Sequence, residues 1–166
     1  MSGSRPVLDA RTILERLVSS GVDFVVIGGI AAVMHGSAQA TFDLDICHAT
    51  DPGNLEALGR VLTALGARLK GVEGDLPFVP DGRTLGQVET LTMVTDAGEL
   101  DVLARPTGGR DYEALRRGAA RFDVGGFSVL VASIADLIAM KRAAGRVKDL
   151  AAVEELEAIE ALGGQA

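Results

Sequence analysis

Several features are scarce in this chain of 166 residues. Aromatic residues make up 4% of it and tryptophan is absent, so we expect no platform of aromatic rings for stacking RNA bases. Cysteine occurs once, as Cys47, which excludes a disulfide within the chain and predicts a cytoplasmic protein. Lysine and arginine total 16 against 23 acidic residues, and the net charge of −7 excludes a generally basic nucleic-acid-binding surface.

Long apolar runs are missing as well. No uninterrupted stretch reaches the ~18 residues of a membrane span, and the first residues lack the apolar core of a signal peptide. The remaining composition, with 48% hydrophobic and 23% charged residues, is typical of a globular protein. Length and composition therefore predict one domain over residues 1–166, with an ordered core from about residue 10 to 160 and no membrane partner.

Hydrophobic periodicity predicts short strands alternating with helices. Helices are expected over residues 9–20, 30–35, 51–65, 112–117, 133–144 and 147–162. Strands are expected over residues 24–27, 41–47, 90–94, 99–103, 122–124 and 127–131, and residues 71–86 should form mostly a loop. This order predicts the fold class α/β (α+β), a small mixed β-sheet with packed helices.

Two glycines, Gly28 and Gly29, follow the first predicted strand. They match neither the dinucleotide-binding pattern G-x-G-x-x-G nor the P-loop pattern G-x-x-x-x-G-K-[ST]. A strand followed by Gly-Gly and a helix can nevertheless place bare backbone N–H groups near a phosphate. The alternative is a tight turn in which a Cβ atom has no room.

Two acids, Asp43 and Asp45, are separated by one residue on the next predicted strand, so both carboxylates should project from the same face. Phe42, Leu44 and Ile46 should occupy the apolar face opposite. Two close carboxylates repel each other unless a cation is present, and hard oxygen ligands suit Mg²⁺. The alternative is an acidic strand face exposed to solvent.

A third acid, Asp101, lies in an otherwise apolar predicted strand. If this strand lies beside the strand of Asp43 and Asp45, three carboxylates converge. Such a triad suits two metal ions roughly 3.5–4 Å apart in a phosphoryl transfer. The alternative is an unrelated surface acid; a fortuitous acid pair predicts that Asp43 and Asp101 lie more than roughly 10 Å apart, too far to share metals.

Together, the run from Val26 to Gly29, then Gly36, then Thr41 to Ile46 resembles the nucleotidyltransferase superfamily related to DNA polymerase beta. The segment from Val131 to Leu150 is similar to the tail of AbiEii-type small bacterial nucleotidyltransferases. The resemblance covers about residues 10–160. It implies a nucleotidyltransferase-type fold, and Asp101 matches the third acid that a later strand contributes in that superfamily.

The resemblance also implies residue roles. Asp43, Asp45 and Asp101 would be the catalytic, Mg²⁺-binding acids, with the phosphates of an NTP near Gly28 and Gly29. Thr41, the threonine of the motif, would belong to the nucleotide-binding residues.

Four basic residues form a local exception near the C-terminus: Lys141, Arg142, Arg146 and Lys148. They are either a clamp on a triphosphate or nucleic-acid backbone, or a solvated helix face. The resemblance favours a binding role for Lys141. Asp149 is expected either to pair with Arg146 or Lys148 or to cap the last helix.

The sequence departs from the family pattern at two positions. Gln39 stands where relatives often have arginine, two residues before Thr41, which removes a phosphate contact or a structural ion pair. Gly29, in place of serine, removes a hydroxyl that could bind phosphate. His35, His48 and Cys47 do not have the ligand number or spacing of a zinc site, and Cys47 is expected to be a buried filler.

The function implied by the resemblance is the transfer of NMP from an NTP to a hydroxyl of RNA such as tRNA, of a protein or of a small molecule. AbiEii-like proteins are associated with toxin–antitoxin systems, so a cognate toxin or antitoxin is an expected partner. The alternative hypothesis is a catalytically silent relative that binds a partner or a nucleotide; Gln39 favours it, and the three acids oppose it.

Overall fold

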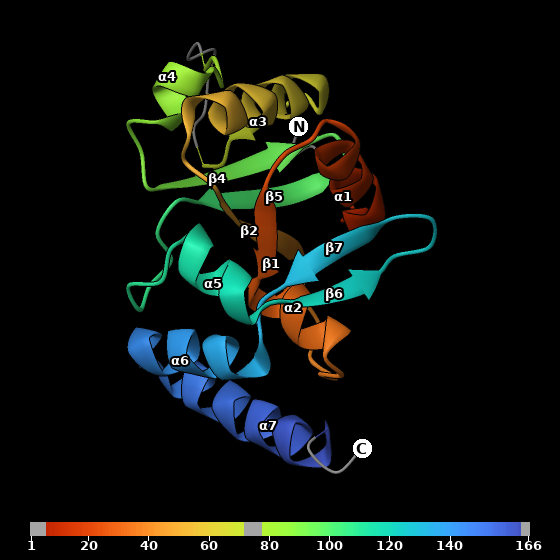
Figure 1. Ribbon diagram of the computed structural model, residues 1–166, viewed down its shortest axis with the longest axis vertical. Coiled ribbons are helices and arrows are strands. Elements are labelled where there is room, and N and C mark those ends of the chain that lie inside the picture. The colour runs from red at the N-terminus through yellow and green to blue at the C-terminus, as the bar shows by residue number, and fades with distance from the viewer. Residues whose placement is uncertain (1–5, 72–77, 164–166) are drawn as a thin grey trace.

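The computed structural model describes residues 6–71 and 78–163, and these residues form a seven-stranded sheet with helices on both sides (Figure 1). The strands are β1 (Phe24–Ile27), β2 (Asp43–His48), β3 (Arg68–Leu69), β4 (Thr90–Thr95), β5 (Gly98–Leu103), β6 (Ala120–Asp123) and β7 (Ser128–Val131). The helices are α1 (Ala10–Ser19), α2 (Gly28–Met34), α3 (Pro52–Ala64), α4 (Gly82–Leu85), α5 (Tyr112–Gly118), α6 (Ile134–Ala144) and α7 (Val147–Gly163).

The sheet is mixed, and its order is β3-β4-β5-β2-β1-β7-β6. β2 is central: it pairs antiparallel with β1 and parallel with β5. β1 in turn pairs parallel with β7, and the outer strands β3, β4 and β6 pair antiparallel. The parallel pairing of β2 with β5 brings together two strands that are more than 50 positions apart in the chain.

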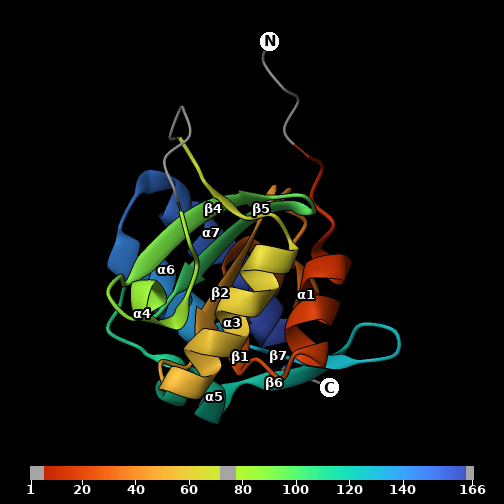
Figure 2. The ribbon, with the colours of Figure 1, turned by 90° about the horizontal axis from the view of Figure 1, so that it is seen from above.

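Helices cover the sheet from two sides. In Figure 1, α1 and α3 lie above the sheet and α2, α6 and α7 lie below it; Figure 2 shows α1 and α3 next to each other. Asp9 caps α1 by accepting a hydrogen bond from the backbone N–H of Thr12 at 3.1 Å. The helix then buries Ile13, Leu14 and Leu17 at helical spacing, which fixes α1 against the core.

Period-two alternation gives the central strands two different faces. On β2, Leu44 and Ile46 are fully buried in the core, as predicted, and on β5 Leu100 and Val102 are also buried. The neighbours of these residues in the chain include the three acids of the predicted site. One face of the same two strands therefore stabilises the fold by apolar burial, and the other carries polar chemistry.

The predicted elements agree with the structure apart from several ends and two short elements. α2 begins at Gly28 and not at Ile30, because the chain turns directly from β1 into the helix. β3 was not predicted, since its two residues are too short for a periodic pattern. The predicted loop over residues 71–86 contains α4, capped by Asp81, which accepts from the backbone N–H of Thr84 at 2.8 Å; residues 72–77 of that prediction lie outside the described part.

The helices in residues 6–71 and 78–163 include none with the length and apolar character needed to cross a bilayer. Cys47 is fully buried, and burial, with the nearby Asp111 carboxylate, raises the pKa of its thiol to about 12. Such a thiol stays protonated at neutral pH, as expected of a core residue. His48 is also buried, whereas His35 packs edge-on against Phe122 with ring centroids 5.2 Å apart.

Candidate functional site

Three carboxylates meet on the polar face of the sheet. The parallel register of β2 and β5 places Asp45 directly beside Asp101. Carboxylate oxygens of Asp43, Asp45 and Asp101 all lie within 4.8 Å of one another. The predicted convergence of the three acids is therefore confirmed, and the separation expected of a fortuitous acid pair is wrong.

The pKa values of two of these carboxylates, Asp45 and Asp101, are raised. Burial, followed by the charges of Asp43 and Asp101, raises the pKa of Asp45 to about 8. Burial also raises the pKa of Asp101. The Oδ1 atoms of Asp45 and Asp101 are buried and have no hydrogen-bond partner. At neutral pH the pair therefore retains a proton in the absence of a cation, since two adjacent buried carboxylates cannot both ionise at low cost.

This arrangement fits a divalent metal ion. Each acid offers one oxygen to a common point, and the two unpartnered buried oxygens are acceptors that a cation would satisfy. An all-carboxylate donor set with half-buried side chains suits Mg²⁺ or Mn²⁺ better than zinc, which prefers nitrogen and sulfur ligands.

The side chains of Asp45 and Thr41 come so close to Gly28 and Gly29 that neither position has room for a Cβ atom. Gly28 has φ +69°, and a Cβ atom there would lie 2.2 Å from Oδ2 of Asp45. A Cβ atom at Gly29 would lie 2.6 Å from Oγ1 of Thr41. The tight-turn interpretation is therefore correct, and the turn serves the acid site, because it lets the β1–α2 junction pass directly beside a carboxylate and a hydroxyl.

Thr41 brings a side-chain hydroxyl close to Gly29, the position at which glycine stands in place of serine. Its Oγ1 lies beside Gly29 and donates a hydrogen bond to the backbone carbonyl oxygen of Asp43 at 3.2 Å. Both Gly29 and Thr41 line the cavity described next, whereas Gly28 borders a smaller neighbouring pocket together with Asp45 and Lys141. The segment preceding β2 thus brings a hydroxyl to the cavity beside Gly29.

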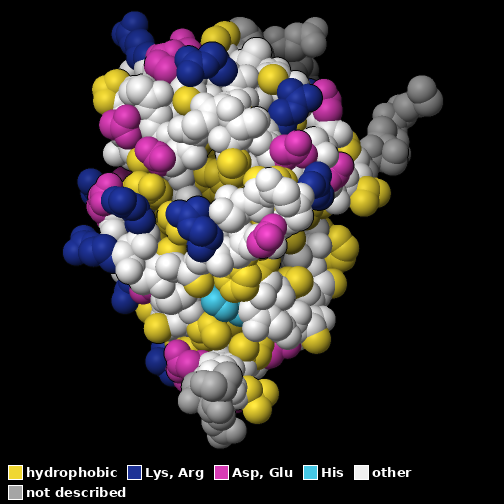
Figure 3. Space-filling model, turned by 45° about the vertical axis from the view of Figure 1, so that its right-hand side comes forward, with side chains coloured by type: hydrophobic (Ala, Val, Ile, Leu, Met, Phe, Trp, Pro, Cys, Tyr) yellow, Lys and Arg dark blue, Asp and Glu magenta, His cyan; other side chains and the backbone are white. Residues whose placement is uncertain are grey.

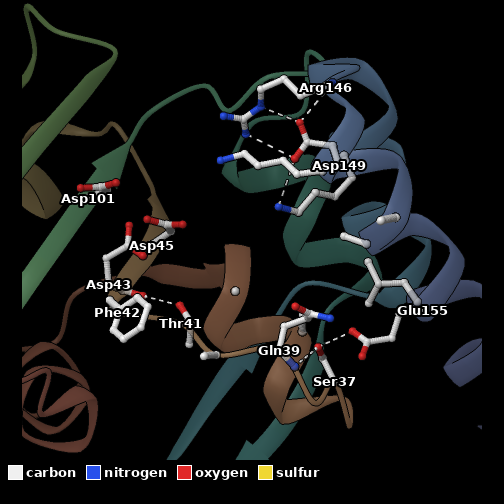
Figure 4. Close-up of a pocket in the computed structure, with 18 residues that line it drawn as sticks. Ser37, Gln39, Thr41, Phe42, Asp43, Asp45, Asp101, Arg146, Asp149 and Glu155 are labelled. Atoms are coloured by element: carbon white, nitrogen blue, oxygen red, sulfur yellow. Dashed lines mark hydrogen bonds and ion pairs between the residues drawn. The ribbon is translucent and has the colours of Figure 1, made fainter.

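A cavity of about 700 Å³ opens in front of the acids (Figure 4). The three acids lie along one side of this cavity, the segment 37–42 borders it below, and α6 and α7 form the opposite wall. Its charged lining consists of five acids and three bases: Asp43, Asp45, Asp101, Asp149, Glu155, Lys141, Arg146 and Lys148. The volume lies within the range of small-molecule and cofactor sites.

The wall of the cavity that α6 and α7 form, called the basic wall here, carries Lys141, Arg146 and Lys148. Two of these bases contact Asp149, which is almost completely buried. Its carboxylate accepts from Nε of Arg146 at 2.6 Å and lies 3.5 Å from Nζ of Lys141. It also accepts from the backbone N–H of Arg146 at 3.3 Å at the start of α7. Asp149 thus forms ion pairs with Arg146 and Lys141 and also caps the start of α7. The hydrogen bond from the Arg146 side chain, above all, holds the pKa of Asp149 below its usual value.

The four basic residues of the sequence separate into two groups. Lys141, Arg146 and Lys148 line the cavity, so the clamp interpretation stays a prediction for these three residues. Arg142 instead pairs with Glu157 on an exposed surface, so the solvated-face interpretation holds for this residue. Lys141 is close enough to Asp45 for its charge to oppose the increase in the pKa of that acid.

The segment before β2 is tied to α7. Glu155 of α7 accepts hydrogen bonds from the Ser37 hydroxyl and, at 3.2 Å, from the backbone N–H of Ala38. The backbone N–H of Gln39 donates to the Ser37 hydroxyl oxygen at 3.1 Å. Gln39 is exposed and lines the cavity, so this position presents an amide in place of a cation. Neither Ser37 nor Glu155 was predicted, because no local pattern pairs residues 118 positions apart.

Phe42 contradicts the alternation seen in the sequence. It was expected on the apolar face with Leu44 and Ile46, but it is 78% exposed and lines the cavity. β2 begins only at Asp43, so the strand alternation does not extend to Phe42.

Comparison with known proteins shows that this chain is similar to a solved structure in its fold only. No protein-family model matches the chain, and no curated protein sequence matches it. Among solved structures, a proposed nucleotidyltransferase from Thermotoga maritima matches with a TM-score of 0.53 and 17% sequence identity, covering 94% of this chain and 91% of that one. The chain therefore has a nucleotidyltransferase-type fold with a mixed sheet, as predicted, and the likeness does not extend to an AbiEii-type assignment.

Proposed function

We propose that this protein is a metal-dependent nucleotidyltransferase that moves NMP from an NTP to an acceptor hydroxyl. The observation that carries the proposal is the convergence of Asp43, Asp45 and Asp101, whose carboxylate oxygens lie within 4.8 Å of one another beside a cavity with a basic wall. A structural acid cluster would be expected to have internal cationic partners, as Asp149 has. Two buried oxygens without partners support a site made for an external cation.

Asp43, Asp45 and Asp101 would hold Mg²⁺. When bound, the metal neutralises the phosphate charge and polarises the phosphoryl oxygens. Without it, and with Asp45 protonated at neutral pH, the four remaining carboxylates of the cavity outnumber its three bases by one, so the site has no net positive charge to attract a triphosphate. Metal binding and NTP binding are therefore expected to depend on each other.

The chain's own residues position the reactants. Lys141, Arg146 and Lys148 attract the triphosphate from the wall opposite the acids, and the Thr41 hydroxyl with the bare backbone of Gly29 contacts it from below. The acceptor oxygen attacks the α-phosphorus, the bond from this phosphorus to the bridging oxygen breaks, and pyrophosphate leaves. Asp101 accepts the proton of the acceptor hydroxyl.

The acceptor is proposed by class: a hydroxyl at an RNA end such as that of tRNA, or one on a protein or small molecule. On the face in Figure 3, basic side chains are interspersed with acidic ones and form no continuous basic surface. Together with the net charge of −7, this favours local recognition of an RNA acceptor, near the cavity, over an extended phosphate track. We place the activity in the cytoplasm, with a cognate toxin or antitoxin as the proposed partner.

One observation favours a second candidate function, a catalytically silent protein that binds nucleotide. Gln39 at the cavity edge supplies no positive charge where relatives often have arginine. This candidate predicts Mg²⁺-dependent NTP binding without transfer to any acceptor, so binding and turnover must be measured separately.

Calorimetric titration of ATP, GTP, CTP and UTP, with and without Mg²⁺, tests the proposal. We expect Mg²⁺-dependent binding in the wild type and in the control Asp123→Asn, an exposed acid on β6, but none in Asp45→Asn. Transfer of labelled NMP to total tRNA or to a protein mixture then separates the two candidates. Equal NTP affinity with and without Mg²⁺, or unchanged affinity in Asp45→Asn, would contradict the assignment of the acids.

A further inference from the structure

Phe42 is an apolar side chain in an exposed position. With 78% of its surface accessible, it is the most exposed of the five phenylalanines. Phe24 is buried, and the remaining three pack against the core: Phe78, Phe122 and Phe127. Since burial of an aromatic ring stabilises a protein, the fold gains nothing from leaving this one uncovered.

The backbone explains why no part of the described chain covers Phe42. Pairing between β1 and β2 ends at Ile27 opposite Asp45, three positions after Phe42. The ring therefore lies beyond the last β1 pair, beside Asp43 and across the cavity from Arg146 and Asp149 (Figure 4). Among the exposed large apolar residues that the structure describes, Phe42 is the one that lines this cavity.

The cavity thus combines two kinds of chemistry. Its acids and bases are suited to a metal-bound polyphosphate, and an uncovered aromatic ring stands at their edge. A ligand with both a polyphosphate and a flat aromatic group matches this combination, and aromatic side chains stack on nucleobases with little regard to sequence. A sugar phosphate or an inorganic polyphosphate would leave the ring exposed.

We propose that Phe42 stacks on the base of the donor nucleotide and so contributes to binding of the NTP. This inference rests on the proposed function. Stacking uses the face of a base and not its hydrogen-bonding edge, so Phe42 is expected to strengthen binding of all four NTPs and not to select one of them.

The absence of tryptophan allows a direct test. In Phe42→Trp the new indole is the only one in the chain, and a stacked base is expected to quench its fluorescence. Mg²⁺ with ATP, GTP, CTP or UTP should quench it, whereas Mg²⁺ with inorganic triphosphate should not. Leu162→Trp is the matched control: this residue of α7 is 71% exposed and does not line the cavity, so its fluorescence should respond to neither ligand.

Affinities in unlabelled variants give a second readout. Phe42→Ala should weaken Mg²⁺-dependent NTP binding roughly 5- to 150-fold and leave binding of inorganic triphosphate unchanged, while Phe42→Tyr should retain most of the NTP affinity. Equal weakening of both ligands in Phe42→Ala would indicate a general structural role and overturn the inference.

Two further outcomes separate this inference from the proposed function. If wild-type protein binds NTP and inorganic triphosphate equally with Mg²⁺, stacking is overturned while the metal–phosphate site stands. If Mg²⁺ promotes binding of neither ligand, both proposals fail. Quenching of the Phe42→Trp variant by a single-stranded oligonucleotide, and not by free NTP, would overturn the assignment to the donor base.

Discussion

Two carboxylate sites, Asp149, which is buried, and Asp45, which is half-buried, line the same cavity and differ in how their charge is balanced. Asp149 is held by Arg146 and Lys141, and its pKa is lowered. Asp45 is surrounded by two other acids, and its pKa is raised to about 8. The comparison teaches that burial of an acid is not by itself a mark of function: Asp149 is satisfied by cations within the chain, whereas Asp45 and Asp101 each keep a buried oxygen without a hydrogen-bond partner among the described residues.

Loss of the Asp45 charge should have the largest effect on activity. Asp45→Asn removes a metal ligand, so we expect NMP transfer to fall roughly a thousandfold or more. The metal-free protein should become more stable at neutral pH, because the amide does not have to take up a proton on folding, as the Asp45 carboxylate does. Initial rates and thermal unfolding measure the two effects, and a variant with wild-type rates would refute the role of Asp45.

The pH dependence of stability should reveal the same repulsion. Because the folded state raises the pKa of Asp45 from 3.8 to about 8, it binds more protons than the unfolded state between these values. The contribution of Asp45 to stability is therefore present at low pH and lost as pH rises through about 8. The loss is on the order of a few kcal/mol.

Denaturant unfolding between pH 5 and pH 9 measures this change. Saturating Mg²⁺ or Asp45→Asn should flatten the curve over this range, since each removes the proton-linked repulsion. A metal-free wild type whose stability does not fall with pH would show that the acids are not coupled.

Gly28→Ala tests the space that the acid site needs. A methyl group at this position would lie 2.2 Å from Oδ2 of the Asp45 carboxylate. The alanine would also have to adopt a positive φ, which side chains with a Cβ atom rarely do. We expect a loss of stability of about 1–3 kcal/mol and weakened Mg²⁺ binding. Gly21→Ala is the control, since Gly21 also has a positive φ but has nothing within 4 Å of its added Cβ atom; an equal loss of metal affinity in both variants would exclude a specific clash.

Asp149→Asn should lower the stability of the metal-free protein, whereas Asp45→Asn should raise it. It leaves Arg146 and Lys141 without their common anion, so thermal unfolding should occur several degrees lower, while Mg²⁺ affinity changes little. The structural contribution of Asp149 is present above its ordinary pKa and is lost as pH falls through its lowered value. A variant more stable than the wild type would show that the cost of burying the Asp149 charge exceeds its pairing with Arg146 and Lys141.

The smallest effect is expected from Gln39→Arg. This substitution adds a positive charge at the edge of the cavity, and Mg²⁺-dependent NTP affinity should increase a few-fold, more at low salt. Titrations at two ionic strengths measure it, with Gln39→Lys for comparison of charge alone. Unchanged affinity would indicate that the arginine of relatives serves a structural pair and not a phosphate.

Prediction from sequence succeeded where local pattern and chemistry agree. Asp43 and Asp45 share a strand face because side chains alternate, and Leu44 and Ile46 are buried for the same reason. It failed at Phe42, because alternation cannot indicate where a strand begins. It also missed the Ser37–Glu155 hydrogen bond, which depends on how α7 packs and not on any local spacing.

The sequence by itself determined the alternating elements, the two acidic positions on β2 and the glycines that precede α2, since these follow from side-chain periodicity and from the steric freedom of glycine. Tertiary structure alone decided three other features: that β5 lies beside β2 and brings Asp101 to the other acids, that Asp149 gathers Lys141 and Arg146 on the opposite wall, and that Phe42 faces the cavity. These features depend on the pairing of strands and the packing of helices distant in the chain, and such long-range contacts leave no periodic signal in the sequence.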